Sequence, residues 1–188
     1  MPRDWMVLNL PNCLTFFRMT VIPFIVILLF FQGKWVAFVA ALLFSSAAIT
    51  DLLDGYIARQ QNSVTFLGKV LDPLADKLLI TASLVMLIPL GRVPAWIVVV
   101  ILLREIAVTG LRGISALDGS AMSASILGKY KTIFQDVALI CLLIHYEYIF
   151  VDFHAVGMFF LWIALTVTVW SGVDYFYRFF KALEGVSG

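Results

Sequence analysis

The sequence predicts an all-α integral membrane protein, a bundle of six transmembrane helices preceded by a short N-terminal interfacial helix. Of its 188 residues, 62% are hydrophobic, whereas a soluble domain is about half apolar. The mean hydropathy is +1.01. The apolar residues form runs close to the ~20 residues that a membrane-spanning helix requires. Glycine and charged residues separate these runs, as is typical of turns.

The first 15 residues are predicted to lie on the membrane surface, because Trp5, Met6 and Leu8 stand beside Arg3 and Asp4. Residues 16–181 are predicted to form one six-helix transmembrane catalytic domain, and residues 182–188 a C-terminal tail. The expected transmembrane segments are Phe16–Phe31, Trp35–Ile57, Leu67–Leu90, Pro94–Leu117, Ile126–Tyr146 and Ala155–Phe180.

The distribution of basic residues predicts the topology. With the N-terminus in the cytosol, Lys34 and Arg92 alone among the 13 Lys and Arg residues fall on the outer side. This bias favours a multi-pass protein of the inner (cytoplasmic) membrane with both termini in the cytosol. The basic residues are spread among apolar segments and the net charge is +1, so the sequence shows no nucleic-acid-binding surface.

Four aspartates, Asp51, Asp54, Asp72 and Asp76, lie within or at the edge of the second and third apolar segments. A carboxylate inside a membrane costs ~2.5–3.5 kcal/mol on insertion scales. Four of them would repel one another unless they were protonated or bound to cations. Each pair is spaced i,i+3 or i,i+4, which places its members on one helix face.

Both pairs are expected at a similar depth near the cytosolic face. At ~1.5 Å per residue, Asp51 lies ~24 Å below Trp35 on the inward helix, and Asp76 lies ~21 Å below Leu90 on the outward helix. Four converging carboxylates offer only oxygen ligands, which suit Mg²⁺ or Mn²⁺. They are numerous enough to hold two ions.

The acidic segment resembles the defining motif of the CDP-alcohol phosphotransferase family at all eight fixed positions. It is written Asp51-x2-Asp54-Gly55-x2-Ala58-Arg59-x8-Gly68-x3-Asp72-x3-Asp76. The opening, Asn9-Leu10-Pro11-Asn12-x-Leu14-Thr15-x2-Arg18, is similar to the family's N-terminal lead-in. Two further stretches are similar to the bacterial branch that makes phosphatidylglycerophosphate: Arg104-Glu105-x6-Arg112 and Gly128-Lys129-x-Lys131-Thr132.

This resemblance implies six transmembrane helices and a homodimer. It implies that Asp51, Asp54 and Asp72 bind metal and that Asp76 is the general base and a further metal ligand. The implied CDP-lipid-binding residues are Asp51, Asp54, Gly55, Ala58, Arg59, Gly68 and Thr15. The small residues Gly55, Ala58 and Gly68 also permit close helix packing, so their role stays open between packing and nucleotide binding.

Basic residues in the later apolar segments indicate which kind of acceptor the protein binds. Arg104 lies halfway along an apolar segment, and Arg112 follows on nearly the same helical face. We expect Glu105 to be a poor partner for Arg104, because adjacent helical residues do not face each other. We hypothesise that Arg104, Arg112, Lys129 and Lys131 form a pocket for a phosphate group, although both lysines equally fit cytosolic positive-inside charge.

A phosphate-bearing acceptor fits sn-glycerol 3-phosphate. The implied reaction transfers a phosphatidyl group from CDP-diacylglycerol in the membrane to that acceptor, giving phosphatidylglycerophosphate and CMP. Alternatives within the family are cardiolipin, phosphatidylserine and phosphatidylinositol-phosphate synthases. Outside the family they are a Mg²⁺-diphosphate prenyltransferase, which uses another spacing, and a divalent-cation transporter, which would not need the arginines.

Overall fold

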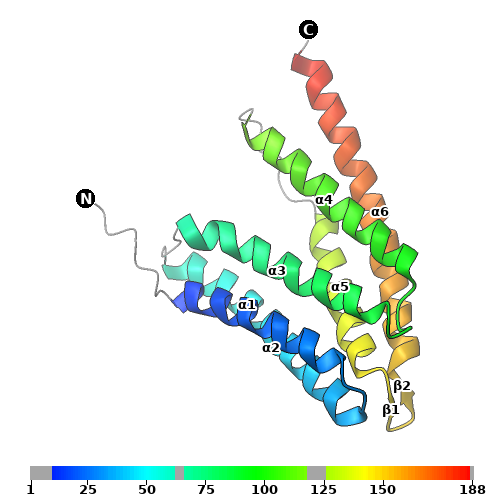
Figure 1. Ribbon diagram of the computed structural model, residues 1–188. Helices are drawn as coiled ribbons and strands as arrows, with labels where there is room; N and C mark the ends of the chain where they lie inside the picture. The colour runs from blue at the N-terminus through cyan, green and yellow to red at the C-terminus, as the bar shows by residue number, and fades with distance from the viewer. Residues whose placement is uncertain (1–9, 62–65, 118–125, 187–188) are drawn as a thin grey trace.

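The chain folds into a bundle of long helices (Figure 1). The computed structural model describes residues 10–61, 66–117 and 126–186; the side chains of residues 10–12, 51–70, 116–127, 129 and 182–188 lie outside this description. The described part contains these elements: α1 (Leu10–Leu29), α2 (Lys34–Gln61), α3 (Phe66–Leu87), α4 (Ala95–Leu117), α5 (Ile126–Ile144), β1 (Glu147–Tyr148), β2 (Val151–Asp152) and α6 (Phe153–Val186).

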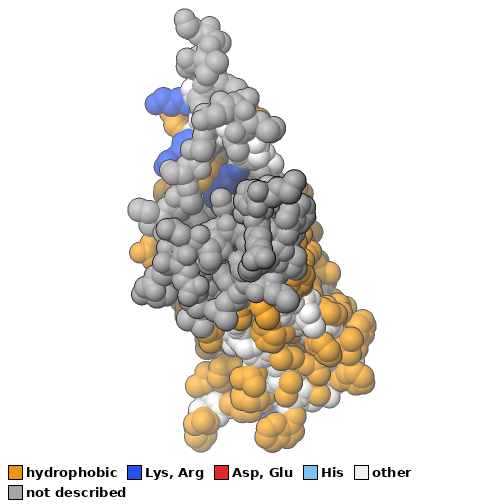
Figure 2. Space-filling view, turned by 90° about the vertical axis from the view of Figure 1, so that its left-hand side faces the viewer, with side chains coloured by type: hydrophobic (Ala, Val, Ile, Leu, Met, Phe, Trp, Pro, Cys, Tyr) orange, Lys and Arg blue, Asp and Glu red, His pale blue; other side chains and the backbone are white. Residues whose placement is uncertain are grey.

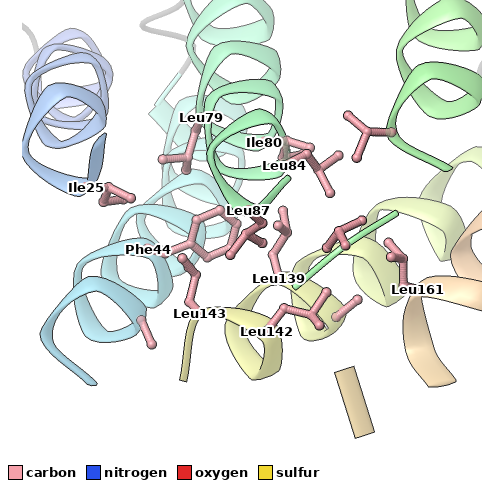
Figure 3. Packing of buried hydrophobic residues seen from close by; sticks show 14 of the residues in the cluster. Ile25, Phe44, Leu79, Ile80, Leu84, Leu87, Leu139, Leu142, Leu143 and Leu161 are labelled. Carbon is pink, nitrogen blue, oxygen red and sulfur yellow. The ribbon is translucent and has the colours of Figure 1, made fainter. Parts of the chain in front are cut away.

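The helices pack in two groups joined through α5. Helix α1 lies against α2 and α3, α6 lies against α4 and α5, and α5 also contacts α2 and α3. Aliphatic and aromatic side chains fill the junction (Figure 3). Phe44 of α2, Leu84 and Leu87 of α3, and Leu139 and Leu142 of α5 are fully buried there. This apolar core holds α3, α4 and α5 close enough to share a polar site.

Helix α6 lies close against α5 at Gly157. A Cβ atom added at Gly157 would lie 2.7 Å from Cγ of Leu142, closer than real atoms pack. Glycine therefore sets the separation of these helices, as small residues do in membrane bundles.

One end of the bundle carries the β1–β2 hairpin together with the α1–α2 and α3–α4 turns, and we call it the hairpin end (Figure 1). The Tyr148 hydroxyl donates to the carbonyl of Lys34 at 3.2 Å, which ties the hairpin to the start of α2. Asp152 caps α6 by accepting from the amides of His154 at 2.9 Å and Ala155 at 3.1 Å. The other end, where α3 begins and α5 begins, is the aspartate end.

The observed helices confirm the all-α prediction. Helix α1 already begins at Leu10, so the last residues of the expected interfacial lead-in are continuous with the first helix. The segment between the expected helices Ile126–Tyr146 and Ala155–Phe180 forms the β1–β2 hairpin, which the sequence did not predict.

Much of the molecular surface is apolar. Figure 2 shows hydrophobic side chains over the hairpin end, whereas most of the visible Lys and Arg lies toward the opposite end. Trp35 is 81% exposed and Ile106 is 72% exposed. Among the described residues, Phe153–Lys181 is long and apolar enough to cross a membrane, and Cys13–Leu29 and Lys34–Thr50 are shorter apolar helices. Surfaces of this kind mark contact with lipid or with other proteins.

Candidate active site

The carboxylate of Asp72 binds two side chains from the neighbouring helix α1. The hydroxyl of Thr15 donates a hydrogen bond to Oδ1 of Asp72. A guanidinium nitrogen of Arg18 lies 3.5 Å from the same oxygen, and Arg18 is 1% exposed. Thr15 and Arg18 are one helical turn apart, so both face α3. The pairing orients Asp72 and gives the buried arginine a counter-charge.

A second charged cluster joins α4 to α5. Oε1 of Glu105 accepts from Arg104 at 3.0 Å and also forms an ion pair with Nζ of Lys131. Lys131 is 5% exposed although it carries an ammonium group. A buried cation is tolerated when a carboxylate lies beside it, which is the arrangement here. We call Arg104, Glu105 and Lys131 the charged triad.

The charged triad corrects one expectation from the sequence. Glu105 was expected to be a poor partner for Arg104, and this was wrong. Backbone positions at i and i+1 point about 100° apart, but both side chains are long enough to bend toward the interior. Burial favours the contact, because neither charge has enough water around it to be solvated alone.

A small cavity connects the charged triad to Asp76. Its volume is about 30 Å³, and its polar lining residues include Asp76, Thr81, Glu105, Lys131 and Gln135. Asp76 follows Asp72 by one turn of α3, about 6 Å along the helix axis. The fold therefore places an aspartate of α3, a glutamate of α4 and a lysine of α5 around one space.

Helix α6 holds the two arginines of α4. Arg104 donates to the hydroxyl of Ser171 at 2.6 Å, and a Cβ at Gly172 would lie 3.1 Å from its Cγ. Arg112 donates to the hydroxyl of Tyr175 at 3.0 and 2.7 Å, and its guanidinium carbon lies 4.8 Å from the centre of that ring. The guanidinium groups of Arg104 and Arg112 are thus positioned by α6 rather than left free.

Several expected site residues fall outside the described side chains. Asp51, Asp54 and Gly55 belong to α2 and Gly68 to α3, as the sequence predicts, and α2 continues past the expected end at Ile57 to include Ala58 and Arg59. Lys129 belongs to the first turn of α5. The side chains of these residues lie outside the described part of the chain, so their roles stay predictions.

Comparison with known proteins identifies the family. The family model for CDP-alcohol phosphatidyltransferase matches residues 8–170. The chain belongs to the CDP-alcohol phosphatidyltransferase family. It is an enzyme of the phosphatidyltransferase class, which confirms the resemblance seen in the eight-position motif.

Relatives cover nearly the whole chain. A protein of Bacillus subtilis (strain 168) named CDP-diacylglycerol–glycerol-3-phosphate 3-phosphatidyltransferase is 42% identical, covering 94% of this chain and 97% of the relative. Proteins of the same name from Rickettsia typhi and Escherichia coli (strain K12) are 42% and 38% identical, each covering 89% of this chain. The aligned regions cover 95% of the Rickettsia typhi protein and 92% of the Escherichia coli protein.

The described carboxylates suit the divalent metal that CDP-alcohol phosphatidyltransferases use. Asp72 and Asp76 present carboxylate oxygens from consecutive turns of α3, and hard divalent cations prefer oxygen ligands. Within the described residues, no group of three or more potential ligands converges, and Asp51 and Asp54 lie outside them. The family's membrane association and the apolar length of α6 place the enzyme at a membrane.

The contributions of three residues to this candidate site were not predicted from the sequence. Arg18 was counted only as a cytosolic charge and as part of the lead-in, yet its position in an apolar segment signalled a buried partner. Glu105 was dismissed as a partner. Gln135 was overlooked, although an amide in the apolar segment Ile126–Tyr146 gave the same kind of signal.

Proposed function

We propose that the chain transfers the phosphatidyl group of CDP-diacylglycerol to sn-glycerol 3-phosphate, giving phosphatidylglycerophosphate and CMP for phospholipid synthesis. One observation carries the choice of acceptor. The cavity that contains Asp76 is also lined by Glu105 and Lys131 of the charged triad. Two cations held beside a carboxylate suit an acceptor that carries both a hydroxyl and a phosphate. The names of the relatives agree with this acceptor.

The chemistry assigns a role to each side chain. The acceptor's terminal hydroxyl oxygen bonds to the phosphorus that bears diacylglycerol, and the bond from that phosphorus to CMP breaks. Asp76 takes the hydroxyl proton, as a positioned carboxylate can. Asp51, Asp54 and Asp72, with Asp76, would hold Mg²⁺ or Mn²⁺, most simply as two ions. When bound, the metal neutralises the diphosphate and stabilises the leaving CMP.

The motif residues would bind the donor. Thr15 lies against Asp72 and is positioned to help present that carboxylate to the CDP-lipid. Asp51, Asp54, Gly55, Ala58, Arg59 and Gly68 complete this binding surface on α2 and α3. Arg104, Arg112, Lys129 and Lys131 would bind the acceptor's phosphate, with Glu105 holding Arg104 and Lys131 until the phosphate arrives.

The membrane arrangement follows from the same proposal. All six helices would cross the inner membrane, with the aspartate end and both termini in the cytosol, where both CMP and glycerol 3-phosphate are soluble. Residues 16–181 would form the catalytic domain between an interfacial segment at 1–15 and a tail at 182–188. Two copies would associate as a homodimer.

An acceptor panel tests the proposed reaction. Purified enzyme with CDP-diacylglycerol and Mg²⁺ or Mn²⁺ should release CMP on addition of glycerol 3-phosphate. Serine, inositol phosphate and phosphatidylglycerol serve as competing acceptors and should release far less. CMP release with another acceptor but not with glycerol 3-phosphate would overturn the proposal. Metal uptake into vesicles without CMP release would favour the transporter alternative instead.

A further inference from the structure

Gln135 is a buried amide with nothing to bind among the residues that the structure describes. It lies on α5 and is 1% exposed. Neither Oε1 nor Nε2 of its side chain has a hydrogen-bond partner within the described part of the chain. Burying both polar atoms of an amide without partners is strongly unfavourable, so such a group implies a polar guest.

The position of Gln135 indicates what this guest is. Gln135 follows Lys131 by one turn of α5, so the two side chains share a face. Both line the cavity of about 30 Å³ that Asp76 also lines. The unpartnered amide therefore stands in the same space as the proposed general base and a proposed phosphate-binding cation.

The size of the cavity suits a small polar group beside Gln135. A space of about 30 Å³ has room for one hydroxyl group or one water molecule there, while the two ends of an acceptor extend beyond it. The proposed acceptor has a reacting hydroxyl at one end, a phosphate at the other and a second hydroxyl on the carbon between them. That middle hydroxyl can donate to Oε1 and accept from Nε2, which satisfies both orphaned atoms.

We propose that Gln135 is a specificity-determining residue that hydrogen-bonds the middle hydroxyl of the acceptor. This inference rests on the proposed function, because it takes glycerol 3-phosphate as the acceptor. The hydrogen bond selects a three-carbon phosphate that carries a hydroxyl at its second carbon over one that lacks it. It also fixes the distance between the reacting hydroxyl and the phosphate.

A substrate pair tests the proposal. Steady-state CMP release is measured with glycerol 3-phosphate and with 3-hydroxypropyl phosphate, which lacks only the middle hydroxyl. Wild type should prefer glycerol 3-phosphate by at least about tenfold in kcat/KM, because a buried amide left unpaired rejects the deoxy analogue. Gln135→Met, which keeps the length of the side chain but has no amide to leave unpaired, should bring this ratio close to 1 by lowering the reaction with glycerol 3-phosphate and raising the reaction with the deoxy analogue.

A matched control removes another buried group that lacks a partner in the described structure. Oγ1 of Thr168 on α6 is such a group, and Thr168 does not line the cavity. Thr168→Val should leave the preference unchanged. Gln135→Asn provides a second variant that keeps the amide but withdraws it by one methylene, and it should also lose the preference.

The outcomes separate this inference from the proposed function. An active wild type without preference between the two acceptors, or a preference that survives in both Gln135 variants, would overturn the role of Gln135 and leave a buried water as the guest. A wild type that releases no CMP with glycerol 3-phosphate overturns the proposed function itself, and this inference with it.

Discussion

Arg92 at the hairpin end and Arg104 halfway along α4 have different roles. Arg92, in the α3–α4 turn at the hairpin end, donates to the carbonyls of Leu142 at 3.3 Å and Leu143 at 2.9 Å. It thereby satisfies main-chain groups that the last turn of α5 leaves unpaired. Arg104 binds the side chains of Glu105 and Ser171 instead, and its Nε has no partner among the described residues.

The comparison shows how to tell a structural cation from an exchangeable one. The partners of Arg92 are carbonyls of a helix that cannot move without unfolding, so its contacts are permanent. The partners of Arg104 are rotatable side chains, and one of them, Glu105, lines the cavity. Arg92 therefore caps a helix end, whereas the contacts of Arg104 are of the kind that the proposed phosphate would replace.

The largest effect is expected at the aspartate end. Asp76→Asn should lower kcat about 10²–10⁴-fold, because the amide cannot accept the hydroxyl proton. The check is CMP release at saturating CDP-diacylglycerol and glycerol 3-phosphate. Asp174→Asn is the matched control, because Asp174 makes only a local ion pair with Arg178 at 3.0 Å among its described contacts. Near-normal turnover by Asp76→Asn would remove Asp76 from the mechanism.

The charged triad should also be a stability element. Glu105→Gln leaves the buried Lys131 and the partly buried Arg104 without their carboxylate and should lower the free energy of unfolding by about 3 kcal/mol. The double variant Glu105→Gln/Lys131→Met should recover part of this loss, because it removes one of the two unpaired charges. Thermal unfolding in detergent is measured for the wild type, for Glu105→Gln, for Lys131→Met and for the double variant. Strictly additive losses would show that Glu105 and Lys131 are not coupled.

Substitution of Arg112 tests whether this residue binds the acceptor's phosphate or only holds α4 against α6. Arg112→Ala should raise the KM for glycerol 3-phosphate roughly tenfold and leave the KM for CDP-diacylglycerol unchanged. Tyr175→Phe removes the hydroxyl that accepts from Arg112 but keeps the ring, and it should change either KM little. Equal increases in both KM values for Arg112→Ala would indicate that Arg112 only braces α4 against α6.

At the hairpin end, substitution should stabilise the protein. Ile149 and Phe150 form the tip of the hairpin with φ angles of +48° and +64°, a conformation that favours Asn-Gly. Ile149→Asn/Phe150→Gly should raise the free energy of unfolding by about 1–2 kcal/mol, because left-handed backbone strains a β-branched residue. The unfolding temperature should rise and turnover should stay constant. A lower unfolding temperature would mean that the exposed apolar tip contributes more than the strain costs.

The smallest expected effect is a pH dependence of folding stability that arises from His145 at the hairpin end. Burial lowers the pKa of His145 below its ordinary value of 6.5, and nearby Arg92 and His154 lower it further while Asp152 opposes them. The unfolded chain then binds a proton more readily, so stability should fall slightly as pH drops below about 6.5 and level off under the lowered pKa. His145→Asn tolerates the φ of +59° and should reduce this dependence in thermal unfolding.

The local pattern of the sequence was sufficient to predict the helices and to place the motif aspartates on consecutive helical turns. Asp72 and Asp76 lie on consecutive turns of α3 because their separation of four residues matches the helical repeat. Asp174 and Arg178 have the same four-residue separation and form an ion pair on α6. The hairpin was not foreseen, because its tip residues lack the turn chemistry that normally signals one.

The sequence by itself determined that acidic and basic residues sit in apolar helices, since composition and helical periodicity are properties of the chain alone. Only the tertiary structure decided their partners: Arg18 against Asp72, Glu105 between Arg104 and Lys131, and Gln135 beside the cavity of Asp76. The physical reason is that partners across helices depend on how each helix is rotated and shifted against its neighbours. That arrangement is set by the packing of the whole apolar core, not by any local spacing.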